Sequence, residues 1–267
     1  MKLRNIPNKI LQILPYRGIP LYYRLLAYKN WKKSGNFIVR PDPFKIVFIN
    51  PKLIVYNTLN RFSYISKRSM FTDCGKIVGG DWDLSNSKFK FNTIYKADNS
   101  SETIYQSLKM RFHERKDWTE TPLVKGWLKL IREGKRAGHG CTTEDLVFQR
   151  FEKLDLLYHE IKTYGYKSKL DIINSSYRDP AKVVPSRNPE LFWYQYDEVV
   201  VNVGRGGEFL FVGGHHRLSM ALIAGIDSIP VRLFVRHNLW QEYRDQLYLG
   251  KVTLDNAEIH PDLVDVI

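Results

Sequence analysis

The sequence predicts an α+β protein, with a mixed sheet and helices in its C-terminal half, preceded by a mainly helical N-terminal region with short strands. Three observations support this class. Apolar residues recur at helical spacing through the middle of the chain, apolar runs flank a glycine-rich turn at 204–207, and residues 209–235 have the pattern strand, helix, strand. With 267 residues and 43% apolar content, the chain can bury a sizeable core.

The chain is strongly basic, with a formal net charge of +13. This balance favours anionic partners, which could be nucleic acid, membrane phosphates or a small phosphorylated metabolite. Its two cysteines, Cys74 and Cys141, form neither a disulfide framework nor a cysteine-rich zinc pattern, so a reducing compartment is expected. Since no run approaches the roughly 20 apolar residues of a membrane span, we expect a cytoplasmic protein without a transmembrane segment or cleaved signal.

The N-terminal region, residues 1–36, is predicted to be a basic amphipathic arm. Residues 1–41 contain no Asp or Glu but nine lysines and arginines, and residues 21–33 have the pattern of an amphipathic helix. Residues 1–35 could therefore bind nucleic acid non-specifically or hold the protein peripherally at an anionic membrane surface. Alternatively, the tyrosine and leucine face packs on the main body while the lysines remain solvated.

Residues 37–140 are expected to form an extension of strands and helices. Prolines punctuate short β-like runs at 37–56, and a second extended stretch ends in Gly79-Gly80-Asp81-Trp82-Asp83. Asp81 and Asp83 share one face of an extended backbone, so they could hold Mg²⁺ or supply a base. A solvated turn with a packed tryptophan is the alternative.

Helical spacing and caps predict helices from Ser101, from Pro122 to Gly134, and from Thr142 or Thr143 to Gly165. A loop rich in Asn, Ser, Pro and Arg follows at 174–190. The third helix opens the expected phosphate-binding domain, residues 141–250. Residues 251–267 form a mildly acidic tail.

The strongest chemical signal is the turn Gly213-Gly214, which separates a β-like run from a helix that starts at His215. The first turn of a helix leaves backbone N–H groups unpaired, glycines allow a ligand to approach closely, and His216 and Arg217 add donors. These features predict a phosphate site. The alternative is that the histidines cap and pack the helix. Neighbouring histidines point in different directions, so no zinc or other metal site is expected from them.

Standard nucleotide-binding and hydrolase motifs are missing. The sequence lacks G-x-x-x-x-G-K-[ST], a dinucleotide fingerprint before a helix, G-x-S-x-G and H-E-x-x-H. Any phosphate chemistry must therefore use another fold.

The stretch Phe211-Val212-Gly213-Gly214-His215-His216-Arg217, followed by Gly225 and Ile229-Pro230-Val231, resembles the ParB/sulfiredoxin superfamily over about residues 145–237. The resemblance implies that this turn binds a nucleotide or phosphate. Its site residues would be Gly213, Gly214, His216 and Arg217, with His215 bordering the site and Ser219 offering a hydroxyl from the first helical turn.

The branches of the superfamily differ at this motif. The sulfinic acid reductases have a catalytic cysteine where this chain has His215, so that activity is excluded. Partition proteins place a helix-turn-helix domain after the motif, for which this sequence leaves no room. The free-serine kinases have Asp-Gly-His-His-Arg, so Gly213 replaces an aspartate and a carboxylate from elsewhere must act. The candidates are Asp81, Asp83, Asp197, Glu198 and Glu208.

The resemblance therefore implies a phosphotransferase acting on a small hydroxyl-bearing substrate, with a nucleoside di- or triphosphate and Mg²⁺. The alternative is a non-catalytic ParB-like module that responds to nucleotides or binds nucleic acid.

Overall fold

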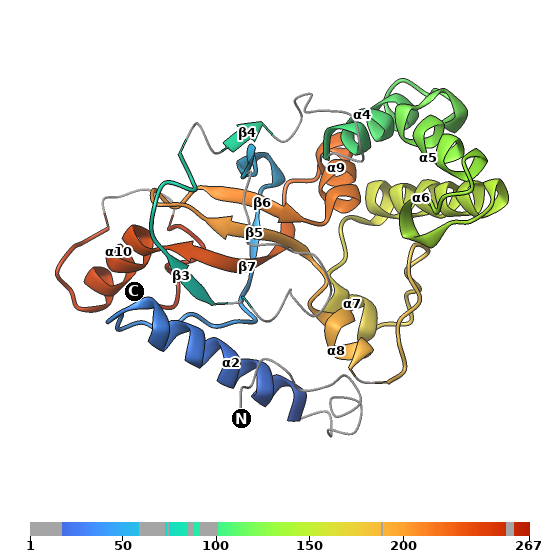
Figure 1. The fold of residues 1–267 in the computed structure, drawn as a ribbon. Helices are drawn as coiled ribbons and strands as arrows, with labels where there is room; N and C mark the ends of the chain where they lie inside the picture. Colours follow the sequence, from blue (N-terminus) through green and yellow to red (C-terminus); the bar gives the residue numbers. More distant parts are fainter. Residues whose placement is uncertain are drawn as a thin grey trace. The chain divides into compact units, whose positions relative to one another are not determined.

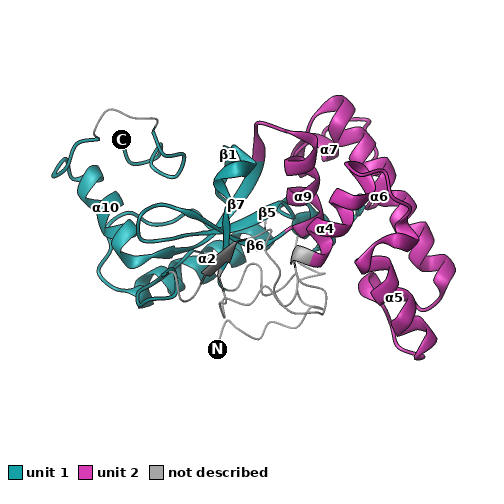
Figure 2. Cartoon of the chain, turned by 90° about the horizontal axis from the view of Figure 1, so that it is seen from above, with its two compact units in different colours: residues 1–90, 185–213, 230–267 teal, residues 91–184, 214–229 magenta. Residues whose placement is uncertain are grey.

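The computed structural model describes residues 18–58, 73, 75–84, 88–90, 101–187, 189–254 and 259–267. The chain forms two compact units, shown in Figure 2. Unit 1 comprises residues 1–90, 185–213 and 230–267, and unit 2 comprises residues 91–184 and 214–229. These units alternate along the sequence. The segment boundaries expected from the sequence, at residues 36, 140 and 250, therefore fall inside the units and not between them.

Unit 1 is built on a mixed sheet with the order β1-β7-β5-β6-β2-β4, and β3 also pairs with β7 (Figure 1). The β5–β6 and β2–β4 pairs are antiparallel, whereas β5–β7, β2–β6 and β3–β7 are parallel. The predicted α+β class with a mixed sheet is thus confirmed. The strands are β1 (Ile46–Ile49), β2 (Tyr56–Thr58), β3 (Lys76–Val78), β4 (Lys88–Lys90), β5 (Val199–Val203), β6 (Phe209–Gly213) and β7 (Ile229–His237).

Strand β7 lies inside the sheet and is buried along its whole length. β5 occupies one edge of β7, so β1 and β3 pair along its other edge. A strand buried on both faces is usually a continuous apolar run. β7 departs from this rule at Arg232 and Arg236, whose side chains are both fully buried.

Unit 1 contains the helices α2 (Gly18–Ser34), α8 (Glu190–Gln195) and α10 (Asn238–Tyr248). One face of α2, including Ile19 and Tyr23, is buried against Phe44, Phe192 and Trp193. The Trp193 indole donates to the Tyr23 hydroxyl at 3.2 Å. The N-terminal helix therefore packs on the main body, as the alternative interpretation of this segment expected. Residues 1–17 of the predicted basic arm lie outside the described residues.

Unit 2 contains the helices α4 (Ser101–Phe112), α5 (Pro122–Arg132), α6 (Glu144–Tyr164), α7 (Lys169–Ile173) and α9 (His215–Ala224). Thr121 and Thr143 cap α5 and α6 by accepting bonds from Val124 N and Leu146 N. α6 ends at Gly165, so the caps read from the sequence are confirmed. The apolar stripe of α6 packs in one core with Trp118, with Trp127 of α5 and with Met220 of α9.

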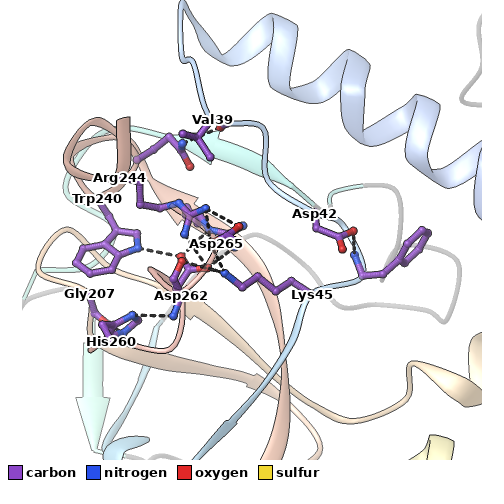
Figure 3. A network of polar contacts seen from close by, with 12 residues as sticks. Val39, Asp42, Lys45, Gly207, Trp240, Arg244, His260, Asp262 and Asp265 are labelled. Atoms are coloured by element: carbon purple, nitrogen blue, oxygen red, sulfur yellow. Dashed lines mark hydrogen bonds and ion pairs between the residues drawn. The ribbon is translucent and has the colours of Figure 1, made fainter. Parts of the chain in front are cut away.

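A buried ionic network in unit 1 holds the C-terminal segment against the sheet (Figure 3). The carboxylate of Asp262 is fully buried and accepts bonds from Arg236 Nε at 2.8 Å and Nη2 at 2.6 Å. Trp240 Nε1 donates to it at 3.0 Å, and Lys45 Nζ lies 3.1 Å away. Burial alone would raise the pKa of Asp262, but these cations hold it below its ordinary value. The acidic tail is thus neutralised internally at this residue.

No helix among the described residues is long and apolar enough to cross a membrane.

Candidate functional site

The predicted turn from strand to helix is confirmed. β6 ends at Gly213 and α9 begins at His215. Gly214 lies between them with φ 94° and ψ 32°, and no side chain caps the helix start. The Leu218 amide donates to the Gly214 carbonyl at 3.0 Å, so the three preceding amides have no acceptor within α9. This helix start therefore carries the partial positive charge of an α-helix N-terminus, which favours a negatively charged ligand.

Gly214→Ala should destabilise the protein and weaken phosphate binding. The left-handed conformation costs an L-residue roughly 1 to 2 kcal/mol, and relief of this strain would move the amides of the first turn. Gly225→Ala is a matched control, because Gly225 ends the same helix at φ 71° with open space around it. Thermal unfolding with and without phosphate should show a similar loss of stability in both variants but weaker phosphate stabilisation only in Gly214→Ala. Equal phosphate responses would contradict a ligand at this turn.

Arg217 is fixed by a buried carboxylate. Its Nη2 donates to Asp179 Oδ2 at 2.7 Å, and Lys169 Nζ donates to the same oxygen at 2.5 Å. The Arg217 guanidinium also lies 5.3 Å from the ring centroid of Tyr166. Burial alone would raise the pKa of Asp179, but Arg217 and Lys169 hold it below its usual range. Arg217, in the first turn of α9, is therefore already paired with a carboxylate. The sequence did not predict this pairing.

Arg150 of α6 adds another cation to this cluster. Its Nη1 donates to the Ala181 carbonyl at 3.1 Å, whereas its Nε is buried and has no hydrogen-bond partner among the described residues. Burial lowers the pKa of Arg150, and the neighbouring Asp179 partly offsets this effect. Three basic side chains thus gather around the buried carboxylate of Asp179, and these four side chains together carry a net positive charge.

The histidines of this cluster are neutral at pH 7. Burial and the charge of Arg150 together lower the pKa of His216 to about 3. Burial and Arg150 likewise lower the pKa of His139 to about 4, while burial lowers that of His215 to about 4. The rings of His139 and His216 lie 5.8 Å apart, and Nε2 of His216 is buried without a hydrogen-bond partner in the described part of the chain. An anion could accept a hydrogen bond from this nitrogen.

These lowered pKa values predict a loss of stability in acid. The folded protein keeps His139 and His216 neutral down to about pH 4, whereas the unfolded chain takes up protons below the ordinary value of about 6.5. The free energy of unfolding should therefore fall between about pH 6.5 and 4. Urea unfolding should show a smaller fall for His216→Gln, which cannot titrate, but an unchanged fall for a variant of the exposed His159, His159→Gln. A parent-like fall in His216→Gln would contradict the assignment.

Comparison with protein-family models, curated proteins and solved structures found no match. Function must therefore be inferred from the arrangement of side chains.

Asp81 and Asp83, two of the candidate carboxylates, share one partner in unit 1. Arg205 donates to Asp83 from its backbone N at 2.6 Å and its Nη2 at 2.8 Å, and to Asp81 from Nη2 at 3.0 Å. Asp83 is buried, and although burial alone would raise its pKa, bonds from Arg205 lower it. Trp82 donates to the Val78 carbonyl at 3.1 Å. This arrangement favours the turn with a packed tryptophan.

The other two predicted residues are enclosed by protein. Glu198, just before β5, is 1% exposed. Ser219 lies in the second turn of α9, not the first, and is fully buried. Its hydroxyl has no hydrogen-bond partner among the described residues. The expected contribution of Ser219 from the first helical turn is therefore corrected. The described residues also contain no group of three or more His, Cys, Asp or Glu side chains placed to hold a metal ion.

Sequence reasoning missed four residues that lie with His216 and Arg217 in this cluster, namely His139, Arg150, Lys169 and Asp179. The sequence offered one local signal, the turn-forming pattern Gly138-His139-Gly140. In the structure this stretch is a short turn in which His139 has φ 56°. Such a conformation is uncommon outside glycine and often marks a constrained site. Asp179 lies within residues 174–190, whose composition predicted a loop but no site.

Proposed function

We propose that unit 2 binds the phosphate of a nucleotide or similar phosphorylated small molecule at the start of α9. The resemblance of this turn to the ParB/sulfiredoxin superfamily is one reason for the proposal. The observation that carries it is the net positive charge of four side chains, in which Arg150, Lys169 and Arg217 lie around the buried carboxylate of Asp179. Buried charges are costly unless paired, so a bound anion would stabilise this arrangement.

Phosphate suits the unsatisfied groups better than a neutral ligand. Arg150 Nε and His216 Nε2 could each contribute a donor, and phosphate offers several strong acceptor oxygens. Guanidinium groups bind phosphate through charge-assisted hydrogen bonds. The neutral state of His216 leaves one ring N–H to donate without adding another charge to the cluster.

The activity proposed for this site is phosphoryl transfer to a small hydroxyl-bearing acceptor, with a nucleoside triphosphate and Mg²⁺. Such transfer depends mainly on positioning and on stabilising charge that develops on the phosphoryl group. A cluster with excess positive charge could supply that stabilisation. The cytoplasmic location expected from the sequence suits this activity, because nucleotides are its proposed ligands.

Binding can be tested by thermal unfolding with phosphate, ATP, ADP, CTP and GTP, each with and without Mg²⁺. A ligand at 100 times its Kd that binds only the folded state should add about 2.7 kcal/mol of stability. Arg150→Met keeps the aliphatic bulk but removes a charged donor, so binding should weaken by roughly 1.5 to 3 kcal/mol. Arg132→Met is the control, because Arg132 is exposed on α5 and pairs with Glu144. The proposal would be contradicted if no ligand raised the melting temperature, or if both variants bound the ligand equally well.

A non-catalytic module is the second candidate function. It is favoured by the bonds from Arg205 to Asp83 and by the cations around Asp179, because each lowers the pKa of the carboxyl and makes the carboxylate a weaker base. Asp81 is also occupied by a hydrogen bond from Arg205. Nucleotide binding without ADP release, across a panel of hydroxyl acceptors, would support this candidate. If nucleic acid is the ligand, affinity should fall steeply with salt, whereas a nucleotide held in a pocket should respond weakly.

A further inference from the structure

Helix α2 has apolar residues on two opposite faces. One face packs in unit 1, as described above. On the other face, Leu21 is 58% exposed, Leu25 48% and Tyr28 41%. The spacing of these residues places them on one stripe, since positions three and four apart on a helix are neighbours. A single exposed leucine is ordinary, but three large apolar side chains on consecutive turns form a continuous surface.

Basic side chains border this stripe. Arg24 and Lys29 lie on its two sides, and Lys32 continues it by one turn. Arg24 is half exposed, and its ion pair with Asp42 is long, at 3.5 Å. Neither α2 nor the first 41 residues of the sequence contain an acidic residue. The exposed face of α2 therefore combines apolar bulk with positive charge that Asp42 compensates only at Arg24 among the described contacts.

We propose that the exposed stripe of α2 docks the protein on the surface of a membrane rich in anionic lipid. In this arrangement Leu21 and Leu25 enter the boundary between headgroups and acyl chains, and the neighbouring cations contact lipid phosphates. Tyr28 is an amphipathic ring suited to the headgroup level. The helix lies on the membrane and does not span it, because its opposite face remains in the core of unit 1.

The leucines favour a lipid partner over nucleic acid. Lysines and arginines can serve either partner, but nucleic acid has no apolar phase to receive an aliphatic side chain, and sequence-independent binding to bases uses aromatic stacking. Tyr28 is the exposed aromatic residue of this stripe, and Lys32 and Arg40 already lie 6.0 and 5.9 Å from its ring centroid. The exposed leucines are therefore the feature that distinguishes the two partners.

The test is cosedimentation of the full chain with vesicles of neutral phosphatidylcholine or of phosphatidylcholine mixed with phosphatidylserine. We expect retention on the anionic vesicles and little on the neutral ones. The double variant Leu21→Ser/Leu25→Ser should lower the partition coefficient by about tenfold or more, since two apolar side chains leave the boundary region. Arg24→Gln/Lys32→Gln should also lower retention, and added salt should weaken binding of the parent.

A matched control removes two exposed leucines from α10 and its end, at Leu239 and Leu249, which are 46% and 45% exposed. Leu239→Ser/Leu249→Ser should bind vesicles like the parent. Circular dichroism and urea unfolding must show that each variant is folded. Equal retention of the Leu21/Leu25 variant, or equal retention on both kinds of vesicle, would overturn the proposal. So would tight duplex DNA binding that needs the cations but not the leucines.

Membrane docking and phosphate binding at α9 can fail separately. The α2 variants should keep the parent's thermal response to nucleotide, and Arg150→Met should keep vesicle retention. A single variant that abolished both while remaining folded would contradict the assignment of these functions to different elements.

Discussion

Asp262→Asn should lower the free energy of unfolding by about 3 to 5 kcal/mol, which is the typical cost of removing one partner from a buried ion pair. The carboxylate it removes is fully buried and faces Arg236, Arg244 and Lys45. An asparagine can accept some of these hydrogen bonds, but it cannot compensate the buried charges of the guanidinium groups. Denaturant unfolding at pH 7 measures the difference directly.

Asp265→Asn is the matched control, because Asp265 contacts Lys45 and Arg244 but its side chain is 41% exposed. Its loss should cost less than about 1 kcal/mol, as for a partly solvated pair. In the parent, the lowered pKa of Asp262 contributes stability that is present above the ordinary carboxyl pKa of about 4 and is lost as pH falls below it. Asp262→Asn should flatten this part of the pH profile. If both variants lost the same free energy of unfolding, the buried carboxylate of Asp262 would not have the stabilising role assigned to it.

Much of the fold was predictable because it depends on local patterns. The helix caps at Thr121 and Thr143, the end of α6 at Gly165, and the β5–β6 hairpin follow from residues close together in sequence. The turn at Gly213-Gly214 was found in the same way. By contrast, the interleaved units depend on β1, β2 and β3 pairing with strands more than a hundred residues later, and periodicity cannot specify such distant pairings.

The candidate site was only partly predictable for the same reason. Gly214, His216 and Arg217 stand together in sequence, whereas Arg150, Lys169 and Asp179 come from two helices and a loop. Charge patterns also cannot show which acidic residues are internally neutralised. Asp83 is a plausible metal ligand in sequence, yet its partner Arg205 lies more than a hundred residues away, and Asp262 appeared to be an ordinary tail acid.

Asp179→Asn should destabilise the free protein by about 3 to 5 kcal/mol, because it leaves two cations without their shared carboxylate. Lys169 is 2% exposed and the Arg217 side chain 13% exposed, so water cannot compensate these charges well. Asp171→Asn is the control, since Asp171 is an exposed capping residue at the start of α7 and carries the same chemical change. Denaturant unfolding in a buffer free of phosphate should separate the two variants by several kcal/mol.

Phosphate should then stabilise Asp179→Asn more than it stabilises the parent. The substitution raises the positive charge at the start of α9, so a bound anion would gain from Arg217 and Lys169 as well as from the amides and Arg150. The increase in melting temperature with phosphate should be larger in Asp179→Asn than in the parent or in Asp171→Asn, and chloride at the same ionic strength should not reproduce it. If the variant is as unstable as expected but phosphate stabilises it no more than the parent, Asp179 serves the fold alone. The excess charge of this cluster would then have to be balanced by something other than a bound phosphate.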